Sequence, residues 1–236
     1  MNTHSVVSIR NLTYAYPDGT KALDSVCLEI KKGERLGIIG PNGAGKSTLL
    51  LHLNGMIAGN GGVIVCGLRA EKKNLKEIRR KVGLVFQNPE DQLFCPTLFD
   101  DVAFGPRNMK IPESVISALV EKSLEKVGLA GMSPKSAFHL SQGQKKRAAI
   151  ATVLSMSPEL LALDEPTSSL DPRARNQVIR LLEELGGTQI IVSHDAALLK
   201  KLCSRVALLS GGKITAESDA ETMLGNLPLL EKHGMM

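Results

Sequence analysis

The stretch Ile38-Ile39-Gly40-Pro41-Asn42-Gly43-Ala44-Gly45-Lys46-Ser47-Thr48 decides the fold. It predicts a loop between a short buried strand at 36–39 and a helix at 47–53. The loop carries the pattern G-x-x-x-x-G-K-S, whose glycines let backbone N–H groups converge on an anion at the positive end of a helix. A chance glycine-rich turn is the alternative, but the strand before and the helix after disfavour it. We predict a phosphate-binding site made of Gly40, Pro41, Asn42, Gly43, Ala44, Gly45, Lys46, Ser47 and Thr48.

The side chains at the end of this loop predict the chemistry of the ligand. Lys46 is expected to neutralise the β- and γ-phosphates of a nucleotide, and the Ser47 hydroxyl to ligate Mg²⁺. The expected cofactors are therefore ATP and Mg²⁺.

Length and composition restrict the class of protein. The 236 residues suit one large domain or one domain with an inserted subdomain. No apolar run reaches the roughly 20 residues of a membrane span, and the polar start at 1–8 lacks the apolar region of a signal peptide. The scattered cysteines are interpreted as structural thiols of a reducing compartment. The net charge is +5, but only Lys145-Lys146-Arg147 forms a basic cluster, so we expect no nucleic-acid partner.

Residues before the loop predict an antiparallel β layer. Residues 6–9, 12–16 and 26–30 are β-rich, and 63–65 is expected to pair with them. Tyr16 is favoured for stacking on the base, against the alternative of an ordinary aromatic on an edge strand.

After residue 82 the chain predicts another strand and then helices. Residues 82–86 form a buried strand ending at Gln87, which can reach Mg²⁺ or the attacking water or can be a surface amide. Residues 88–156 predict a helical insertion, with an amphipathic helix at 113–127 whose buried side is Val115, Leu119, Val120 and Leu124. Phenylalanines cluster between 86 and 104, as a small core or as a groove for a partner helix.

Two further segments carry polar residues at the ends of predicted elements. Ser141 and Gln144 form a capping box, which explains both residues structurally unless the helix end holds a second phosphate. The apolar strand 160–163 ends at Asp164, expected in the Mg²⁺ shell, and Glu165, expected to deprotonate water. A helix at 171–186 and a strand at 190–193 follow, and His194 lies where a γ-phosphate sensor is needed. A hairpin at 206–217 and a short amphipathic tail complete the chain.

Taken together, these motifs resemble an ABC-type ATPase domain along nearly the whole chain. GPNGAGKST (40–48) is similar to the Walker A motif, Gln87 to the Q-loop, and LSQGQ (140–144) to the signature motif. LLALDE (160–165) is similar to Walker B with its catalytic Glu165, SSLD (168–171) to the D-loop, and His194 to the switch histidine.

The resemblance implies an α/β fold of the P-loop NTPase class: a mixed β-sheet core, an antiparallel β subdomain and an inserted α-helical subdomain. Residues 5–87 and 157–217 would form the RecA-like core with its antiparallel layer. Residues 88–156 would be the helical subdomain, and 218–236 the tail of a single domain spanning 1–236.

The resemblance also implies a head-to-tail dimer with a second copy or a paralogue. Ser141, Gly143 and Gln144 of one subunit would close on the ATP held by the other. One departure is Gln142, where the family has glycine. Because a lost glycine removes backbone freedom near a phosphate, we hypothesise slower turnover.

A finer resemblance lies in VFQNPEDQLFCPTLFDDVAFGP (85–106) and HLNG (52–55). Both are similar to ATPase subunits of energy-coupling-factor importers, especially the cobalt and nickel group. This implies a peripheral subunit at the cytoplasmic face of the cell membrane. It would bind an integral membrane scaffold, with Leu93 and Phe94 gripping the scaffold's coupling helices, and act with a substrate-binding membrane subunit. A vitamin importer, another ABC transporter motor, a soluble ABC ATPase and a simple nucleotide kinase are the alternatives, and the transported substance is not encoded in this chain.

Overall fold

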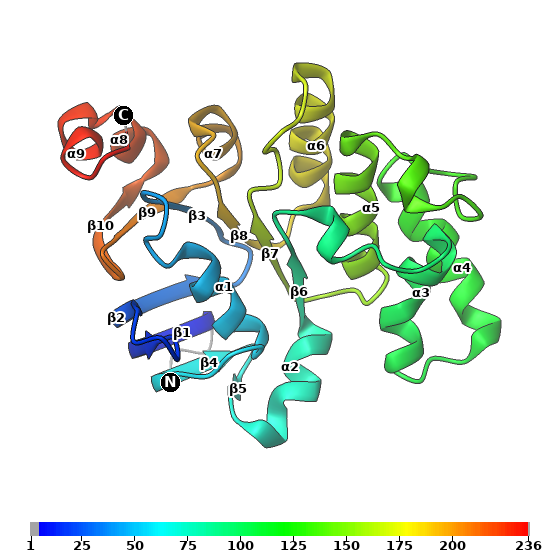
Figure 1. The fold of residues 1–236 in the computed structure, drawn as a ribbon, viewed down its shortest axis with the longest axis horizontal. Coiled ribbons are helices and arrows are strands. Elements are labelled where there is room, and N and C mark those ends of the chain that lie inside the picture. The colour runs from blue at the N-terminus through cyan, green and yellow to red at the C-terminus, as the bar shows by residue number, and fades with distance from the viewer. Residues whose placement is uncertain (1–4, 236) are drawn as a thin grey trace.

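The computed structural model describes residues 5–235. The predicted polar start of the chain lies partly outside this range, as does the last residue of the tail. Within the described range, a mixed sheet of six strands runs in the order β10-β9-β3-β8-β7-β6 (Figure 1). All neighbours in it are parallel except β9 and β10, which form the predicted terminal hairpin. Its strands are β3 (Arg35–Ile39), β6 (Val82–Val85), β7 (Leu160–Asp164), β8 (Thr188–Val192), β9 (Arg205–Ser210) and β10 (Lys213–Asp219).

A second, antiparallel sheet has the order β2-β1-β4-β5. Its strands are β1 (Ser5–Ala15), β2 (Lys21–Lys31), β4 (Asn60–Val65) and β5 (Leu68–Arg69). The sequence predicted β segments at 6–9 and 12–16 separately, but both belong to β1. The register of β1 against β2 shifts between Ile9 and Leu12, where Asn11 takes a left-handed backbone (φ 51°). A bulge therefore makes one strand look like two in the sequence.

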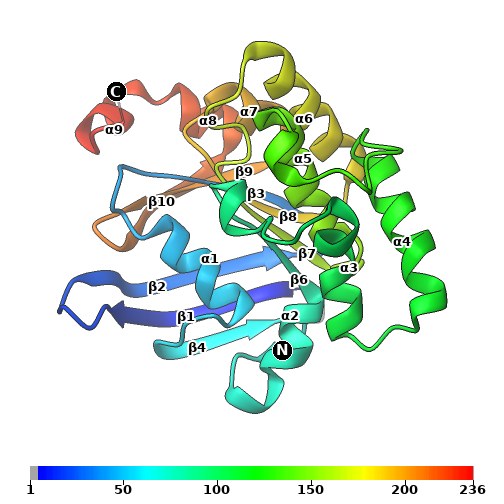
Figure 2. The ribbon, with the colours of Figure 1, turned by 45° about the vertical axis from the view of Figure 1, so that its right-hand side comes forward.

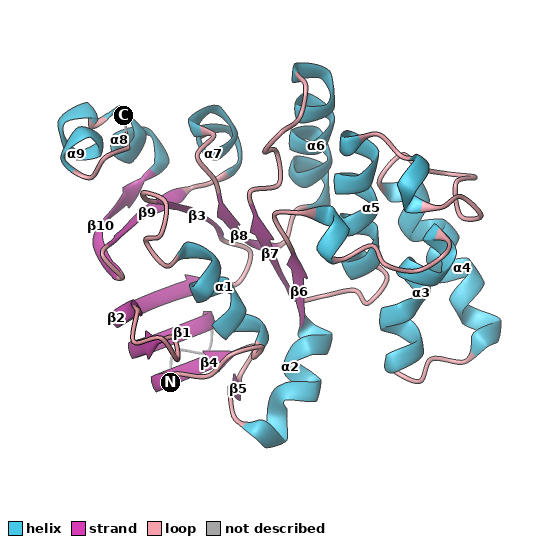
Figure 3. Cartoon of the chain, viewed as in Figure 1, coloured by secondary structure: helices cyan, strands magenta, loops and turns pink. Residues whose placement is uncertain are grey.

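Helix α1 (Lys46–Asn54) lies between the two sheets (Figure 2). Its Leu49, Leu50 and Leu53 pack with Leu23 of β2 and Ile38 of β3 in one buried cluster. The other face of the mixed sheet is covered by helices from the second half of the chain (Figure 3). These are α5 (Gln142–Leu154), α6 (Pro172–Leu185), α7 (Ala196–Leu202) and α8 (Ala220–Gly225). Both faces of the sheet are therefore buried, which explains why its central strands are largely apolar.

The helices of residues 88–156 extend beyond β6 at one end of the sheet (Figure 1). They are α3 (Leu98–Asn108), α4 (Glu113–Lys126) and α5, with 3₁₀ turns η2 (Pro89–Asp91) and η3 (Ala137–His139). Helix α2 (Leu75–Lys81), preceded by η1 (Lys72–Asn74), leads into β6, and α9 (Leu227–Lys232) ends the chain.

The buried side of α4 differs from the prediction at one position. Val115 is 46% exposed, whereas Ile116 is fully buried beside Val120 and Leu124. Val120 and Leu124 are buried as predicted, and Leu119 is half-buried. Ile116 rather than Val115 completes this face, because residues at i, i+4 and i+8 lie on one side of a helix, here the side toward α3 and α5. None of the helices in residues 5–235 combines the length and the apolar character that crossing a bilayer requires.

Candidate functional site

The predicted phosphate loop joins β3 to α1. Gly40, Gly43 and Gly45 all have positive φ, at 154°, 76° and 99°. A Cβ atom on Gly40 would lie 1.9 Å from the Leu209 carbonyl oxygen, and one on Gly45 would lie 2.3 Å from the Ala22 carbonyl oxygen. Gly45 is also the N-cap of α1 and supplies no side-chain cap. The first N–H groups of α1 therefore have no acceptor within the helix and remain available to an anion.

Lys46 holds the loop together in this structure. Its Nζ donates to the carbonyl oxygens of Gly40 (2.6 Å) and Pro41 (2.9 Å), and lies 3.3 Å from Nε2 of His194. Burial lowers the pKa of the Lys46 ammonium, while the charges of Glu165 and Asp164 oppose that shift. The cation thus lies at the meeting point of β3, β7 and β8.

Asp164 and Glu165 are found where the sequence predicted them, at the carboxyl end of β7. Burial raises the pKa of the Asp164 carboxylate, while the nearby Ser47 hydroxyl and the charges of Lys46 and Lys146 oppose that shift. The backbone N–H of His194 donates to Oε1 of Glu165 (3.0 Å), and the Ser193 hydroxyl donates to Oε2 (3.3 Å). Burial raises the pKa of Glu165, so this carboxylate is a better proton acceptor than one in water.

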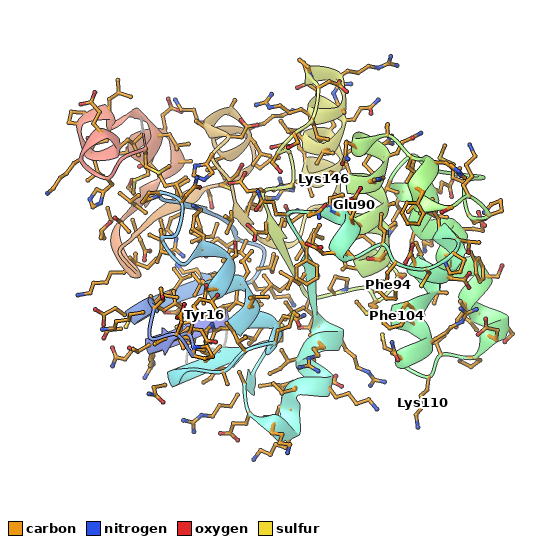
Figure 4. The ribbon with its side chains drawn as sticks, viewed as in Figure 1. Tyr16, Glu90, Phe94, Phe104, Lys110 and Lys146 are labelled. Carbon is orange, nitrogen blue, oxygen red and sulfur yellow. The ribbon has the colours of Figure 1, made fainter. Side chains whose placement is uncertain are left out.

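These groups line one cleft of ≈ 760 Å³. Of the predicted residues, it contains Tyr16, Asn42, Gly43, Ala44, Gly45, Lys46, Ser47, Thr48, Gln87, Asp164, Glu165 and His194. Such a gathering at the carboxyl ends of parallel strands is the usual site of an α/β sheet. Tyr16 lies after β1 at the rim (Figure 4), and its hydroxyl is 2.9 Å from the Thr48 hydroxyl.

The signature residues lie outside this cleft. Ser141, Gly143 and Gln144 form the first turn of α5, and none of them lines it. The predicted capping box is present: the Gln144 N–H donates to Ser141 Oγ (3.3 Å), and the Ser141 N–H donates to Gln144 Oε1 (2.9 Å). Gln142 is exposed and has no positive φ. The backbone freedom of a glycine is therefore not used here in the single subunit.

The sequence reasoning missed Lys146, which is 3% exposed on α5. Its Nζ donates to the carbonyl oxygens of Gln87 (2.5 Å) and Glu165 (2.8 Å) and to the Ser168 hydroxyl (3.1 Å). From the sequence, this residue is placed only in the basic cluster Lys145-Lys146-Arg147. Its spacing from Gly143 and Ile150, both buried, was the signal that it faces the core.

A second groove, of ≈ 860 Å³, lies between α2, β6 and α3. Phe94 (64% exposed) and Phe104 (50% exposed) stand on its wall, edge to face, with ring centroids 5.2 Å apart (Figure 4). The prediction for Leu93 is wrong: this side chain is 7% exposed and belongs to the core against α3 and α5. Phe94 and Phe104 do line a groove, and a partner helix in that groove stays a prediction.

Comparison with known proteins agrees with this geometry. Residues 23–168 match the family model described as ABC transporter. The chain is 48% identical over 229 residues to a putative ABC transporter ATP-binding protein of Geobacter sulfurreducens, covering 97% of this chain and 92% of that protein. It is 50% identical over 218 residues to the energy-coupling factor transporter ATP-binding protein EcfA of Methanothermobacter thermautotrophicus, covering 90% and 70%.

Solved structures are also similar. CbiO1 of Clostridium perfringens, described as part of the ABC transporter complex CbiONQ, superimposes with a TM-score of 0.84 at 36% identity, covering 97% of this chain and 94% of that one. The dimeric ATP-binding cassette MJ0796 with ADP and Pi gives 0.81 at 29% identity, covering 91% and 98%. Matches of this extent, together with the phosphate loop and the paired carboxylates, show that the chain belongs to the ABC transporter family as an ATPase subunit.

Proposed function

We propose that this chain is the ATP-hydrolysing motor of a membrane importer for a micronutrient, cobalt or nickel ions. The ATPase of a vitamin (biotin-type) energy-coupling-factor importer, or of another ABC transporter, is the alternative. One observation carries the importer part: an exposed aromatic groove lies on the same chain as a nucleotide cleft with its phosphate loop and paired carboxylates. The choice of metal rests on the resemblance of residues 85–106.

The proposed ligands fit Mg²⁺ by their chemistry. Ser47, Asp164 and Gln87 supply a hydroxyl, a carboxylate and an amide to the same cleft, and oxygen donors are what this ion prefers. The Ser47 hydroxyl lies close enough to the Asp164 carboxylate to lower its pKa, and this proximity supports their joint role. When bound, the ion would neutralise charge on the β- and γ-phosphates.

The remaining residues of the cleft divide the hydrolysis between them. Lys46 and the loop N–H groups hold the phosphates, and Tyr16 stacks on the base. Glu165 takes a proton from a water molecule while the oxygen of that water bonds to the γ-phosphorus. The bond from the γ-phosphorus to the bridging oxygen breaks, and ADP and phosphate are released. His194, with Nε2 3.5 Å from Oε1 of Glu165 and 3.3 Å from Nζ of Lys46, would contact the γ-phosphate.

Hydrolysis needs a second subunit in this proposal, a second copy or a paralogue arranged head to tail. Support comes from the dimeric form of MJ0796 and from the position of Ser141, Gly143 and Gln144, which are away from their own cleft. In the dimer they would contact the partner's ATP.

The groove with Phe94 and Phe104 would receive a coupling helix of an integral membrane scaffold, which in turn binds a substrate-binding membrane subunit. Residues 88–156 would then act as a helical subdomain that transmits movement from the 5–87 and 157–217 core. The chain would be peripheral, at the cytoplasmic face of the cell membrane.

The first test is capture of the tagged chain from gently solubilised native membranes. Recovery of a polytopic scaffold and a small membrane subunit is the expected result, and recovery of soluble partners alone would favour a soluble ABC ATPase. Uptake of labelled cobalt, nickel and biotin by cells with and without this chain then separates the substrates. Loss of biotin uptake alone would favour the vitamin importer.

A matched set of variants tests the groove. Phe94→Asp should abolish co-purification of the scaffold while ATP binding stays at the parent level, because the side chain is exposed and lies away from the cleft. Val115→Asp, at an exposed apolar position of α4, is the control and should still capture the scaffold. Leu93→Asp should instead lower the melting temperature, because it places a charge in the core. Full capture by Phe94→Asp would contradict the docking proposal.

A further inference from the structure

Lys146 connects segments that are distant in the sequence but meet at the cleft. From α5, its ammonium reaches the carbonyl of Gln87 after β6, the carbonyl of Glu165 after β7 and the hydroxyl of Ser168 beyond it. Figure 4 labels Lys146 where α5 meets the chain that follows β6. Every donor of the ammonium thus has an acceptor on another element.

The contact with Glu165 is the informative one. Glu165 has a left-handed backbone (φ 45°), which a residue with a side chain adopts only when its surroundings impose it. Its carbonyl oxygen accepts from Lys146 Nζ (2.8 Å) and from the Ser168 hydroxyl (2.9 Å). These bonds fix the peptide group that directs the Glu165 carboxylate toward the cleft.

A lysine is a costly choice for a purely structural link. Burial lowers the pKa of Lys146 to about 8, against the opposing charges of Glu165 and Asp164. A buried ammonium is tolerated only where its hydrogen bonds are satisfied. The neighbouring Lys145 differs, since it pairs with the exposed carboxylate of Glu90 at 2.6 Å.

We propose that Lys146 is a positioning residue that ties helix α5 to the backbone of Glu165 and Gln87. Through it, a displacement of the helical part of the chain moves the proposed catalytic base and the proposed Mg²⁺-ligating amide together. Removing the ammonium leaves the Glu165 carbonyl held by Ser168 alone and unties it from α5, which misplaces the carboxylate without removing any group that holds ATP. The inference rests on the proposed role of Glu165.

The test is steady-state hydrolysis by the full chain, with ATP binding measured separately. Lys146→Met should lower kcat by about 10- to 100-fold, the effect of displacing a catalytic group by about 1 Å, with KM and the ATP dissociation constant unchanged. Lys146→Arg, which keeps the charge and the donors, should restore most of the rate. Lys145→Met is the matched control on the adjacent position and should hydrolyse ATP like the parent.

Each outcome decides the inference. A kcat for Lys146→Met at the parent level would overturn it. So would a fall in kcat that is accompanied by a lower melting temperature and weaker ATP binding, since that indicates a general loss of structure. Failure of Lys146→Arg to restore the rate would also contradict it. If Lys146→Met does not fold, Ser168→Ala takes its place. This variant removes the hydroxyl that bridges Lys146 and the Glu165 carbonyl. Its kcat is then expected to fall while KM stays constant. Glu165→Gln separates the two proposals: if this variant still hydrolyses ATP, the role of Glu165 fails instead.

Discussion

The molecule contains two glycine-bearing helix starts that resemble each other in sequence but are built differently. Before α1, the loop glycines have positive φ and close backbone neighbours, and no side chain caps the helix. Before α5, Ser141 and Gln144 satisfy each other's N–H groups. Gly143 has no positive φ; its Cβ would instead meet Cβ of Ala174 on α6 at 2.7 Å.

This difference indicates two ways of holding a phosphate. The start of α1 offers free backbone donors in a fixed shape, so it can bind an anion within one subunit. The start of α5 uses the N–H groups of Ser141 and Gln144 in its capping box. The N–H groups of Gln142 and Gly143, at the start of the helix, and the hydroxyl hydrogen of Ser141 are left for a phosphate, so this end has fewer free donors and none of the positive-φ loop shape that precedes α1.

The largest effect expected from this contrast is at Gly40. Gly40→Ala should weaken ATP binding by about 100-fold or more, since backbone strain of about 1–3 kcal/mol and displaced N–H donors both oppose binding. Fluorescent-nucleotide titration measures it. Gly143→Ala is the comparison: overpacking against Ala174 should cost about 1–3 kcal/mol of stability and leave binding to the subunit's own cleft intact. If Gly143→Ala weakened ATP binding as much as Gly40→Ala, the proposed difference between the starts of α1 and α5 would be wrong.

A smaller effect is expected at Ser141. Ser141→Asp keeps a good helix cap but places a negative charge where the partner's phosphate is expected, so kcat should fall about 10- to 100-fold at unchanged melting temperature. Ser141→Ala should lose about 1 kcal/mol of stability with the cap. Thermal unfolding and ATPase rates measure both. A normal rate for the aspartate variant would mean that this helix end does not meet a phosphate.

The smallest effect is expected at Gln142. Gln142→Gly should raise kcat about two- to five-fold, equivalent to about 0.5–1 kcal/mol of barrier, if the side chain hinders closure of the dimer. Because Gln142 is exposed and has no positive φ, the gain should come from closer approach of the partner rather than from relief of strain. An unchanged ATPase rate would end this hypothesis.

Local features of the chain were predictable because their causes are local. The loop at 40–48 needs a left-handed backbone at certain positions, and the glycines that adopt it can be recognised in the sequence. The apolar run ending at Asp164 is typical of a buried parallel strand, and the capping box of α5 depends on residues at fixed spacing. The candidate cleft followed from these, since strand ends meet at one edge of a parallel sheet.

Features that depend on packing partners were not predictable. Leu93 and Phe94 are adjacent and both apolar, yet one is in the core and the other is exposed, and only the position of α3 and α5 decides which. The spacing of Lys146 indicates that it faces the core, but the acceptors that its ammonium binds there come from two other segments and could not be predicted. Ile116 and not the predicted Val115 lies on the buried side of α4, because the orientation of a helix is set by the elements that it packs against.

The hydrogen bond between Tyr16 and Thr48 has a consequence for which nucleotides the cleft accepts. Thr48 lies in the first turn of α1, so the aromatic ring proposed for the base is anchored to the same helix that follows the phosphate loop. The distance between the proposed base site and the phosphate loop is then fixed. Stacking on a ring is tolerant of which purine is present. We therefore expect selection for a nucleoside triphosphate by its length, with little discrimination between adenine and guanine by this tyrosine.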